Sequence, residues 1–501
     1  MSRRKRRVRK QSAGTPAKGA KRGPRAGSET RPADAATREP NPVAPPSAPA
    51  TASLPVAMPA PPVATPAPSA IAPAPPVATP APRVAPPAPP IAPTAPPVAS
   101  RPAAPLSDGP RVLRVGLDAR SLQGGFREDS GRGIGVYARE LIRALAARRD
   151  LALTVWFEPA LPAVPTGMVP PGVNVRRYAR TLLPLRDRLS SQLSVRAAAA
   201  SRSHDVFHWL AHANAPAFPP RRSVITVHDL ILEQLATLYP RHKSLGYRTA
   251  RGLEAMAIRH AGVLVTDSEA TRADVVIRHG RDPARVLVAP LGVNARFAPA
   301  TAPEVAAVRK FHDLSTPFVL YLGGIDARKD IPMLLDAFAR VRAGRSEPLL
   351  LVLAGHVLHA PEYPELMQRA RGLAITDALR VLEFVPLNHL TMLLTAARVF
   401  AFPSRSEGFG LPPLEAMACG TPVVSTTGGS LGEVLGDAAL TVAPGDTKAF
   451  ARALTRALDD EALRTRLRAR GLAHAASYTW ARTAEATVQA YRLAARAKAS
   501  V

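Results

Sequence analysis

Short apolar runs recur along most of the chain, and the segments between them carry apolar residues at helical spacing. Five runs in the first series have the length and the β-branched content of buried strands: residues 111–117, 151–157, 224–230, 262–268 and 285–293. Residues 135–149 form one of the amphipathic stretches that lie between them. Strands that alternate with helices form parallel sheets covered on both faces, so this series predicts an α/β domain over residues 111–300.

The same pattern then starts again after a proline-bearing connector. The second series of apolar runs comprises residues 317–324, 348–355, 380–385, 398–404 and 422–426. It predicts a second α/β domain over residues 310–475, so that the chain holds two Rossmann-like domains. Ligands of such sheets bind outside the carboxyl ends of the strands, and two sheets facing each other would enclose a cleft.

The N-terminal region has a different composition. The 70 residues from 41 to 110 hold 25 of the 54 prolines, and the octapeptide PPVATPAP occurs twice there. Proline cannot donate to a backbone ladder, so this segment is expected to be an extended linker of the polyproline II type. Residues 1–40 carry thirteen Lys or Arg against three Asp or Glu, a local net charge of +10, and are expected to be a disordered basic tail.

Three interpretations of the basic tail remain open. It could contact anionic lipid, with about 1 kcal/mol for each basic residue near the surface. It could bind nucleic acid by counterion release, although no aromatic residue is interleaved for base stacking. It could also serve only to keep a chain of formal net charge +28 in solution.

Cysteine content and hydropathy bear on the compartment. Cys419 is the single cysteine, which excludes a disulfide framework within the chain and fits a reducing environment. We find no apolar run of about 18 residues and no signal-peptide core after the basic N-terminus. We therefore expect a cytoplasmic protein, with residues 1–40 as the candidate for peripheral contact with the inner face of a membrane.

The richest candidate site is the stretch SRSEGFGLPPLEAMACG, which follows the predicted strand 398–404. Its double proline fits only the first turn of a helix, which predicts a helix over 412–418 with Gly420 as a left-handed cap. Glu407 is then in the loop and Glu415 in the first helical turn. The alternative for Glu415 is a favourable interaction with the helix dipole, worth about 0.3–1 kcal/mol. The whole arrangement at a strand end favours ligand binding.

A basic pair stands at the end of the first strand of the second series. Asp330 suits a helix N-cap and Gly344 a helix end, which predicts a helix between them. Arg328 and Lys329 then occupy the strand-to-helix loop. A guanidinium fork and an ammonium together suit a diphosphate, whereas the alternative is solvated surface charge.

The first series offers weaker candidates. Gly131, Gly133 and Gly135 lie between a predicted strand and helix, but their spacing is not that of a dinucleotide-binding loop. His228 and Asp229 end another predicted strand. A lone histidine is more often structural, and the alternative is that His228 orients an acceptor or shuttles a proton.

These motifs, in this order, resemble glycosyltransferase family 4. SEGFGLPPLEAMACGTPVV is similar to the EX7E signature of that family, and YLGGIDARKD to its basic donor-phosphate loop. GRGIGVYAREL, TVHDL, TDSEATRADV and APLGV resemble motifs of its first domain and of the lead into its second. YTWARTAEATVQAYR resembles a terminal helix that crosses back to the first domain, here expected at 476–497. The likeness covers residues 111–495 and is greatest to mannosyltransferase-type members.

The resemblance implies the GT-B fold and a retaining transfer of a hexose, with mannose the sugar it favours, from a GDP- or UDP-sugar. A glycan or lipid-linked acceptor in surface polysaccharide synthesis is expected. The residues that it implies for catalysis are His228, Arg328, Lys329 and Glu407. The residues that it implies for donor binding are Gly133, Gly135, Gly324, Arg328, Lys329, Glu407, Gly408, Phe409, Gly410, Leu411 and Glu415.

Within this assignment, the basic pair would hold the diphosphate, Glu407 the donor sugar and Glu415 the ribose. No D-x-D triplet occurs, so we expect no metal and no cofactor beyond the donor itself. The sequence departs from the family at Gly432, where proline is usual before Glu433. The alternative function is a non-catalytic nucleotide-sugar-binding protein that is recruited through its basic tail.

Overall fold

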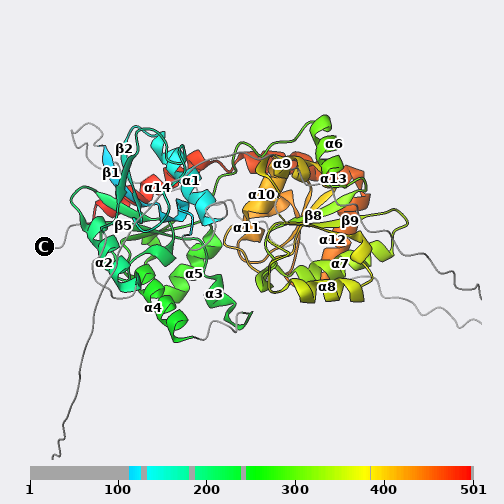
Figure 1. Cartoon of the computed structure of the whole chain (residues 1–501), viewed down its shortest axis with the longest axis horizontal. Coiled ribbons are helices and arrows are strands. Elements are labelled where there is room, and N and C mark those ends of the chain that lie inside the picture. The colour runs from blue at the N-terminus through cyan, green and yellow to red at the C-terminus, as the bar shows by residue number, and fades with distance from the viewer. Residues whose placement is uncertain (1–111, 126–132, 180–186, 239–243, 384, 498–501) are drawn as a thin grey trace, which may run out of the picture. The chain divides into compact units, whose positions relative to one another are not determined.

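The computed structural model describes residues 112–125, 133–179, 187–238, 244–383 and 385–497. The tail expected at 1–40, the linker expected at 41–110 and Gly131 lie outside these residues. The described chain forms two parallel sheets with helices on both faces (Figure 1). This confirms the α/β class and the two successive sheets that the apolar runs predict.

The first sheet has seven strands in the order β3-β2-β1-β4-β5-β6-β7, and all neighbours are parallel. Its strands are β1 (Leu113–Asp118), β2 (Leu151–Phe157), β3 (Asn174–Arg177), β4 (Val206–Trp209), β5 (Ser223–Val227), β6 (Val263–Thr266) and β7 (Val286–Val288). Every residue of β4, β5 and β6 is buried. The centre of the sheet is therefore covered on both faces, which is why these strands read as nearly continuous apolar runs.

The second sheet has six parallel strands in the order β10-β9-β8-β11-β12-β13. Its strands are β8 (Phe318–Leu322), β9 (Leu350–Ala354), β10 (Leu379–Leu382), β11 (Val399–Phe402), β12 (Val423–Thr426) and β13 (Leu440–Val442). Chain order reverses between β8 and β11, which are neighbours at the centre of the sheet. Such a switch point is where an open parallel sheet leaves room for a ligand.

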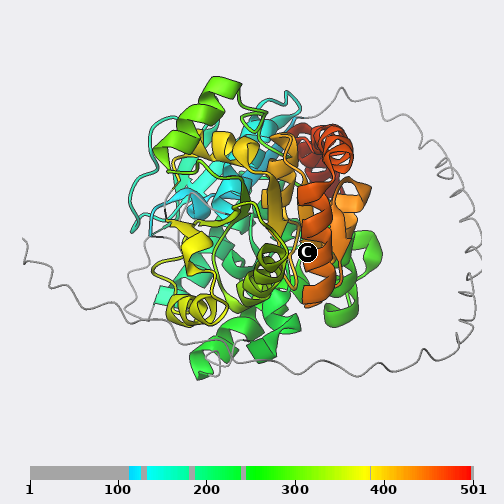
Figure 2. The same ribbon diagram turned by 90° about the vertical axis from the view of Figure 1, so that its right-hand side faces the viewer.

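Helices cover both sheets. Those that follow strands of the first sheet are α1 (Ile134–Ala146), α2 (Asp187–Ala200), α3 (Ile231–Gln234), α4 (Leu245–His260) and α5 (Glu269–His279). Those of the second are α6 (Ala302–Phe311), α7 (Ile331–Ala343), α8 (Tyr363–Gly372), α9 (Leu387–Ala396), α10 (Leu411–Ala418), α11 (Leu431–Leu435), α12 (Thr447–Asp459) and α13 (Glu461–Ala476). Helix α12 packs on α13, as the adjacent orange helices in Figure 2 show. In the described chain no helix is both long and apolar enough to cross a membrane.

Three strands escape the sequence prediction. β3 is fully exposed and carries two arginines, so it has no apolar pattern. β4 contains a histidine among its four residues, and the three residues of β13 are only partly buried, so neither stands out as an apolar run. β4 nevertheless matters, because it places His208 in the interior of the first sheet. The domain boundaries proposed from the sequence stay predictions.

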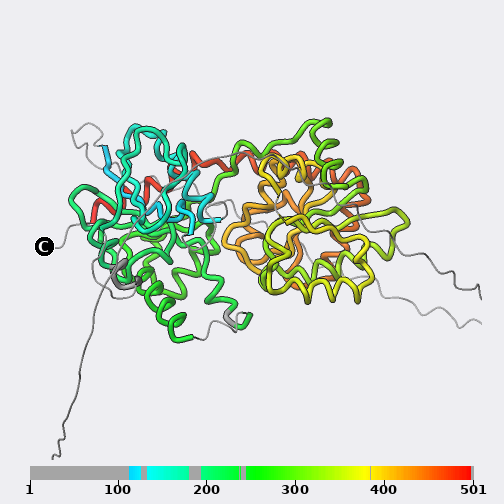
Figure 3. Tube along the Cα trace, viewed as in Figure 1, coloured from blue at the N-terminus to red at the C-terminus, as the bar shows by residue number. Residues whose placement is uncertain are grey.

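The last helix, α14 (Trp480–Ala495), leaves the second sheet and packs on the first, beside α1 (Figure 3). The two segments that cross between the sheets are bonded to each other: Val293 N–H donates to the Tyr478 carbonyl at 2.9 Å. Gly292 lies against the start of α14, where an added Cβ would come within 2.2 Å of the Trp480 nitrogen. A side chain at position 292 would therefore force the two crossing segments apart.

A buried chain of hydrogen bonds fixes α14 to the first sheet. The Tyr491 hydroxyl meets His208 Nδ1 at 2.8 Å, and His208 Nε2 meets Thr226 Oγ1 at 2.8 Å. Thr226 Oγ1 also lies 2.8 Å from the Tyr137 hydroxyl in α1. Burial lowers the pKa of His208 to about 3, so its ring is neutral and offers one donor and one acceptor. This series of hydrogen bonds joins α14, β4, β5 and α1 through polar side chains that have no access to water.

We predict that Tyr491→Phe lowers the free energy of unfolding by about 1–3 kcal/mol, because His208 Nδ1 then stays buried without a partner. Urea unfolding of the full chain measures the change. Tyr363→Phe is the control, because the Tyr363 hydroxyl makes no hydrogen bond to another described residue. An equal loss of unfolding free energy in the two variants would contradict a structural role for the buried hydrogen bonds of Tyr491 and His208.

Candidate active site

Two cations and one carboxylate meet at the carboxyl edge of the second sheet. Arg328 and Lys329 belong to a short 3₁₀ turn, Ala327–Lys329, that follows β8. Glu407 lies in the loop that follows β11, the strand next to β8. Arg328 Nη1 donates to Glu407 Oε2 at 2.7 Å, and Lys329 Nζ donates to Glu407 Oε1 at 2.7 Å. The parallel register thus brings the two sequence motifs together.

This cluster is largely removed from water. The side chains of Glu407 and Lys329 are each 10% exposed, whereas that of Arg328 is 27% exposed. Burial opposes ionisation of Glu407, but the charges of Lys329 and Arg328 lower its pKa to about 2. Lys329 Nζ also lies 4.9 Å from the centre of the Phe402 ring. Glu407 is therefore ionised at neutral pH and neutralises two cations that have few other partners.

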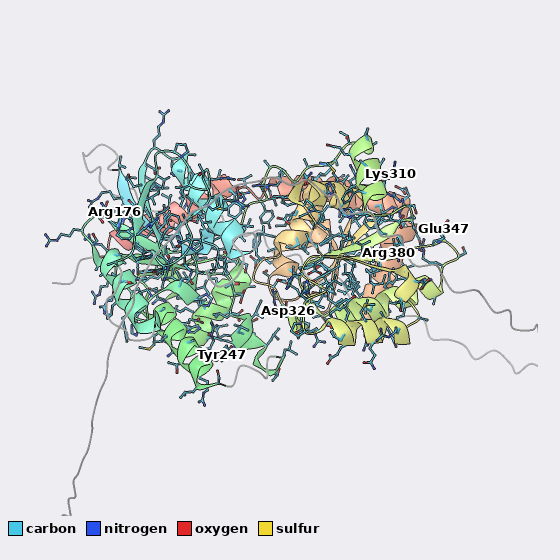
Figure 4. The ribbon with its side chains drawn as sticks, viewed as in Figure 1. Arg176, Tyr247, Lys310, Asp326, Glu347 and Arg380 are labelled. Carbon is cyan, nitrogen blue, oxygen red and sulfur yellow. The ribbon has the colours of Figure 1, made fainter. Side chains whose placement is uncertain are left out.

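Arg328 has a second acidic neighbour at the rim of the site. Its Nε lies 3.2 Å from Asp326 Oδ1. Asp326 is labelled in Figure 4, where it stands on the side of the second sheet that faces the first. Gly324 precedes it in the same loop, and its Cα has open space on the side where a Cβ would stand. The loop after β8 is thus accessible at Gly324 and Asp326 and closed at Lys329.

The loop that carries Glu407 touches the first sheet's half of the chain. A Cβ added to Gly408 would lie 2.1 Å from the His228 carbonyl oxygen, so only glycine fits this approach. Phe409 is buried and packs edge-on against Tyr478 in the crossing segment. Gly410 adopts a left-handed conformation at φ 102° and begins α10, in which Leu411 is the first residue. Of these predicted donor-binding residues, Phe409 uses its side chain to pack against Tyr478.

Glu415 does not lie where the sequence predicts. Helix α10 begins at Leu411, one residue before the double proline, so Glu415 falls beyond the first turn. The interaction with the helix dipole that we considered from the sequence therefore loses its basis. Glu415 forms no hydrogen bond through its side chain within the described chain, and burial raises its pKa to about 7 against the opposing charge of Arg296. Glu415 is only partly buried, and a carboxyl group without a partner at such a position is suited to binding a ligand. Gly420 has φ 77° just past this helix, as predicted.

The first sheet contributes its glycine motif only in part. Gly133 is the exposed N-cap of α1 at φ 42°, with open space around the position of an added Cβ. Gly135 is buried inside the first turn of α1 rather than in a loop. No contact of either glycine with Arg328 or Glu407 is present. Gly133 therefore remains a candidate for ligand approach, and the donor-binding role of Gly135 stays a prediction.

His228 follows β5, and both of its ring nitrogens have partners in the protein. Nδ1 lies 2.7 Å from Asp267 Oδ2, and Nε2 lies 2.9 Å from the Leu210 carbonyl oxygen. A carbonyl only accepts, so Nε2 carries a hydrogen. Burial disfavours the charged ring, but Asp267 raises the pKa of His228 above its ordinary value. The sequence left open a role in proton transfer or in orienting an acceptor, but in this structure neither nitrogen is available to a ligand.

Helix α5 joins the two halves through its first turn. Its N-cap residue Ser268 donates from Oγ to the Gly408 carbonyl at 2.9 Å. Glu433 of α11 accepts hydrogen bonds from the amides of Glu269 at 2.8 Å and Ala270 at 3.0 Å. A carboxylate is favoured at this end of a helix by the unpaired N–H groups and the helix dipole. These contacts hold the Glu407 loop against the first sheet's half of the chain.

Several residues of this arrangement escape the sequence prediction. Asp267, Ser268 and Glu433 stand in stretches that resemble family motifs, but their partners are distant in sequence. Arg405 is also missed; its Nε donates to Asp330 Oδ2 at 2.8 Å. The only available signal is position, because each follows or precedes a strand end. No group of three His, Cys, Asp or Glu that could hold a metal ion occurs in the described ranges.

Both sheet-forming halves of the chain are similar to known protein families. Residues 131–297 match the family model described as Glycosyltransferase Family 4, and residues 306–474 match that of Glycosyl transferases group 1. A D-inositol 3-phosphate glycosyltransferase from Geodermatophilus obscurus is 33% identical over 424 residues, which cover 78% of this chain and 91% of that protein.

The chain belongs to glycosyltransferase family 4. The O-antigen chain mannosyltransferase B of Escherichia coli is 29% identical over 373 residues, which cover 72% of this chain and 96% of that protein. Sucrose-phosphate synthase from Thermosynechococcus elongatus superposes with a TM-score of 0.58 at 23% identity, over 76% of this chain and 98% of that chain. The enzyme is a glycosyltransferase, and its two parallel sheets have the GT-B arrangement.

We predict that Glu407→Gln lowers the free energy of unfolding by about 2–4 kcal/mol at pH 7, because two buried cations lose their counter-charge. The native pKa of Glu407, about 2, lies below its ordinary value of 4.5. Its contribution is therefore fully present above about pH 4.5 and is lost as the pH falls towards 2. Chemical denaturation at pH 7 and pH 3 measures both differences.

The control for this experiment is Glu485→Gln. Glu485 pairs with Arg148 at the surface, where its side chain is 48% exposed, so the expected change is below about 1 kcal/mol. A loss for Glu407→Gln that is equally large at pH 3 and pH 7 would show that charge pairing is not the cause.

Proposed function

We propose that this glycosyltransferase transfers mannose from a nucleotide-sugar donor, GDP- or UDP-linked, with retention at the anomeric carbon. The proposed acceptor is a glycan or lipid-linked oligosaccharide in the synthesis of a surface polysaccharide. The observation that carries the proposal is the buried carboxylate of Glu407 between Arg328 and Lys329 at a switch point of the second sheet. Similarity to an O-antigen chain mannosyltransferase along 96% of its length supports the sugar and the acceptor class.

The basic pair is proposed to bind the donor diphosphate. A guanidinium matches two phosphate oxygens at once, and an ammonium adds a point charge beside it. Negative charge accumulates on the diphosphate as its bond to the sugar breaks, and fixed cations stabilise that charge without reorganisation. We propose on this basis that the leaving group needs neither a metal ion nor a further cofactor.

The two glutamates are proposed to bind the polar ends of the donor. Glu407 can accept hydrogen bonds from sugar hydroxyls when the diphosphate takes over its cations. Glu415 lies beyond the first turn of α10, is partly buried, and forms no side-chain hydrogen bond within the described chain. Its carboxylate can accept from both ribose hydroxyls. We assign no nucleophile, because no second carboxylate is identified at the reacting centre.

The location of the enzyme is part of the same proposal. We propose a cytoplasmic enzyme that contacts the anionic inner face of a membrane through residues 1–40. The net charge of +10 in that segment supports contact with lipid headgroups, and a lipid-linked acceptor would be found there.

Incubation of the full chain with a panel of GDP- and UDP-sugars tests the function. We expect GDP-mannose to raise the melting temperature and to be hydrolysed slowly, both with and without EDTA. Added mannose-containing glycan or inositol phosphate then identifies the acceptor class, since relatives of both kinds are similar to this chain.

Two results of this panel would contradict the proposal. Loss of hydrolysis in EDTA would refute metal independence and leave the donor assignment standing. Binding of a donor without hydrolysis or transfer to any acceptor would favour the alternative of a non-catalytic nucleotide-sugar-binding protein.

We predict that affinity for the nucleoside diphosphate of the preferred donor rises about tenfold from pH 6 to pH 8. With a pKa of about 7 in the empty site, Glu415 must lose its proton before it can accept two ribose hydroxyls. Titration calorimetry at several pH values measures the profile. Glu415→Gln should bind with a flat profile apart from titration of the phosphate itself, and an identical slope in both proteins would exclude Glu415 from the site.

A further inference from the structure

The loop that carries the basic pair is tied to the Glu407 loop at a second place. Arg405 N–H donates to the Arg328 carbonyl at 2.7 Å, and Arg405 Nε donates to Asp330 Oδ2 at 2.8 Å. One residue of the β11 loop thus contacts the residues on both sides of Lys329. These contacts are separate from the bonds that Glu407 makes to the cations.

Asp330 has an unusual conformation for its role. It is the N-cap of α7, yet its side chain bonds no amide of that helix. Its backbone is left-handed at φ 49° and ψ 44°, a region that is uncommon outside glycine, although aspartate and asparagine adopt it more often than other residues. The carboxylate is 6% exposed and points instead to Arg405. The turn between Lys329 and α7 is therefore strained, and the ion pair supports it.

Binding of a diphosphate changes what holds the two loops together. Glu407 is the acceptor for both Arg328 and Lys329 in the empty site, so phosphate oxygens must replace it on those cations. The direct connection between the loops through Glu407 then weakens. The contacts of Arg405 involve no atom that phosphate would need, so they persist.

We propose that Arg405 is a positioning residue, which acts through Asp330 and the Arg328 carbonyl to keep Arg328 and Lys329 aimed at the donor diphosphate once Glu407 releases them. This inference rests on the proposed function. An ordinary exposed ion pair is the alternative, because the Arg405 side chain is 45% exposed and exposed pairs contribute little to stability. A surface pair of that kind would not discriminate between ligands with and without phosphate.

The test compares nucleoside diphosphate with nucleoside. Calorimetry on the full chain measures Kd for GDP, guanosine, UDP and uridine in the unmodified protein, Arg405→Gln, Asp330→Asn and the double variant. Asparagine keeps the shape of Asp330 and tolerates the left-handed region, so Asp330→Asn removes the charge alone. The control is Arg398→Gln, because Arg398 precedes the same strand, is 46% exposed and pairs with the exposed Glu461.

We expect Arg405→Gln and Asp330→Asn each to weaken binding of the preferred diphosphate by about 5- to 20-fold and to leave nucleoside affinity within twofold. Arg405 and Asp330 act through one ion pair. The double variant should therefore bind the diphosphate as tightly as the single variant with the lower affinity. Arg398→Gln should match the unmodified protein. If Arg405→Gln does not fold, Asp330→Asn supplies the same measurement.

Three results would overturn the inference: unchanged diphosphate affinity in both single variants, an equal loss for nucleoside and diphosphate, or additive losses in the double variant. If the unmodified protein binds neither GDP nor UDP, the proposed donor site falls as well. Binding by the unmodified protein together with unaffected variants would refute the role of Arg405 alone.

Discussion

The arrangement of the candidate site depends on one constraint: a buried charge must have a partner. Arg328 and Lys329 can remain in a nearly dry position only because Glu407 neutralises them there. Glu407 reaches them because β8 and β11 are adjacent parallel strands whose following loops leave the same edge. The sheet topology thus supplies the proximity, and electrostatics supplies the reason that the two loops stay in contact. Replacing Glu407 leaves both cations without this partner, whereas replacing Arg328 or Lys329 leaves Glu407 paired with the other cation.

The second sheet does not build this site alone. The Glu407 loop approaches the first sheet so closely that Gly408 meets the His228 carbonyl with no space for a Cβ. Ser268 and Glu433 then bond across the same boundary from opposite sides. Helix α14 and its buried tyrosine-to-histidine bond hold the first sheet to the chain segment that leaves the second. Backbone proximity, rather than a large charged interface, therefore positions the Glu407 loop relative to the first sheet.

Periodicity and strand-end position carry most of what the sequence could predict. The apolar runs predict two parallel sheets because buried strands must be apolar throughout, and Arg328, Lys329 and Glu407 follow because function gathers at strand ends. Contacts between residues that are distant in the chain could not be predicted in this way. Nothing local indicates that Asp267 and Leu210 occupy both nitrogens of His228, or that Asp330 bonds Arg405 rather than its own helix. The start of α10 was also misplaced by one residue, because a double proline limits a helix start without fixing it, and this moves Glu415 out of the first turn.

The charges around the basic pair set limits on how an anion can bind. Arg328 and Lys329 both pair with Glu407, Arg328 also pairs with Asp326, and Arg405 pairs with Asp330. Under the proposed function, a diphosphate would enter by exchange, because it would have to displace carboxylates from the two cations. Asp326 is at the rim and its side chain is 38% exposed, whereas the Glu407 side chain is 10% exposed and would need a new partner. In the proposed complex, hydroxyl groups of the donor sugar would provide that partner, and a phosphate without an attached polyol would leave Glu407 unsatisfied. The proposed site would thus favour a glycosyl diphosphate over a free phosphate through the hydrogen bonds of Glu407, without any additional positive charge.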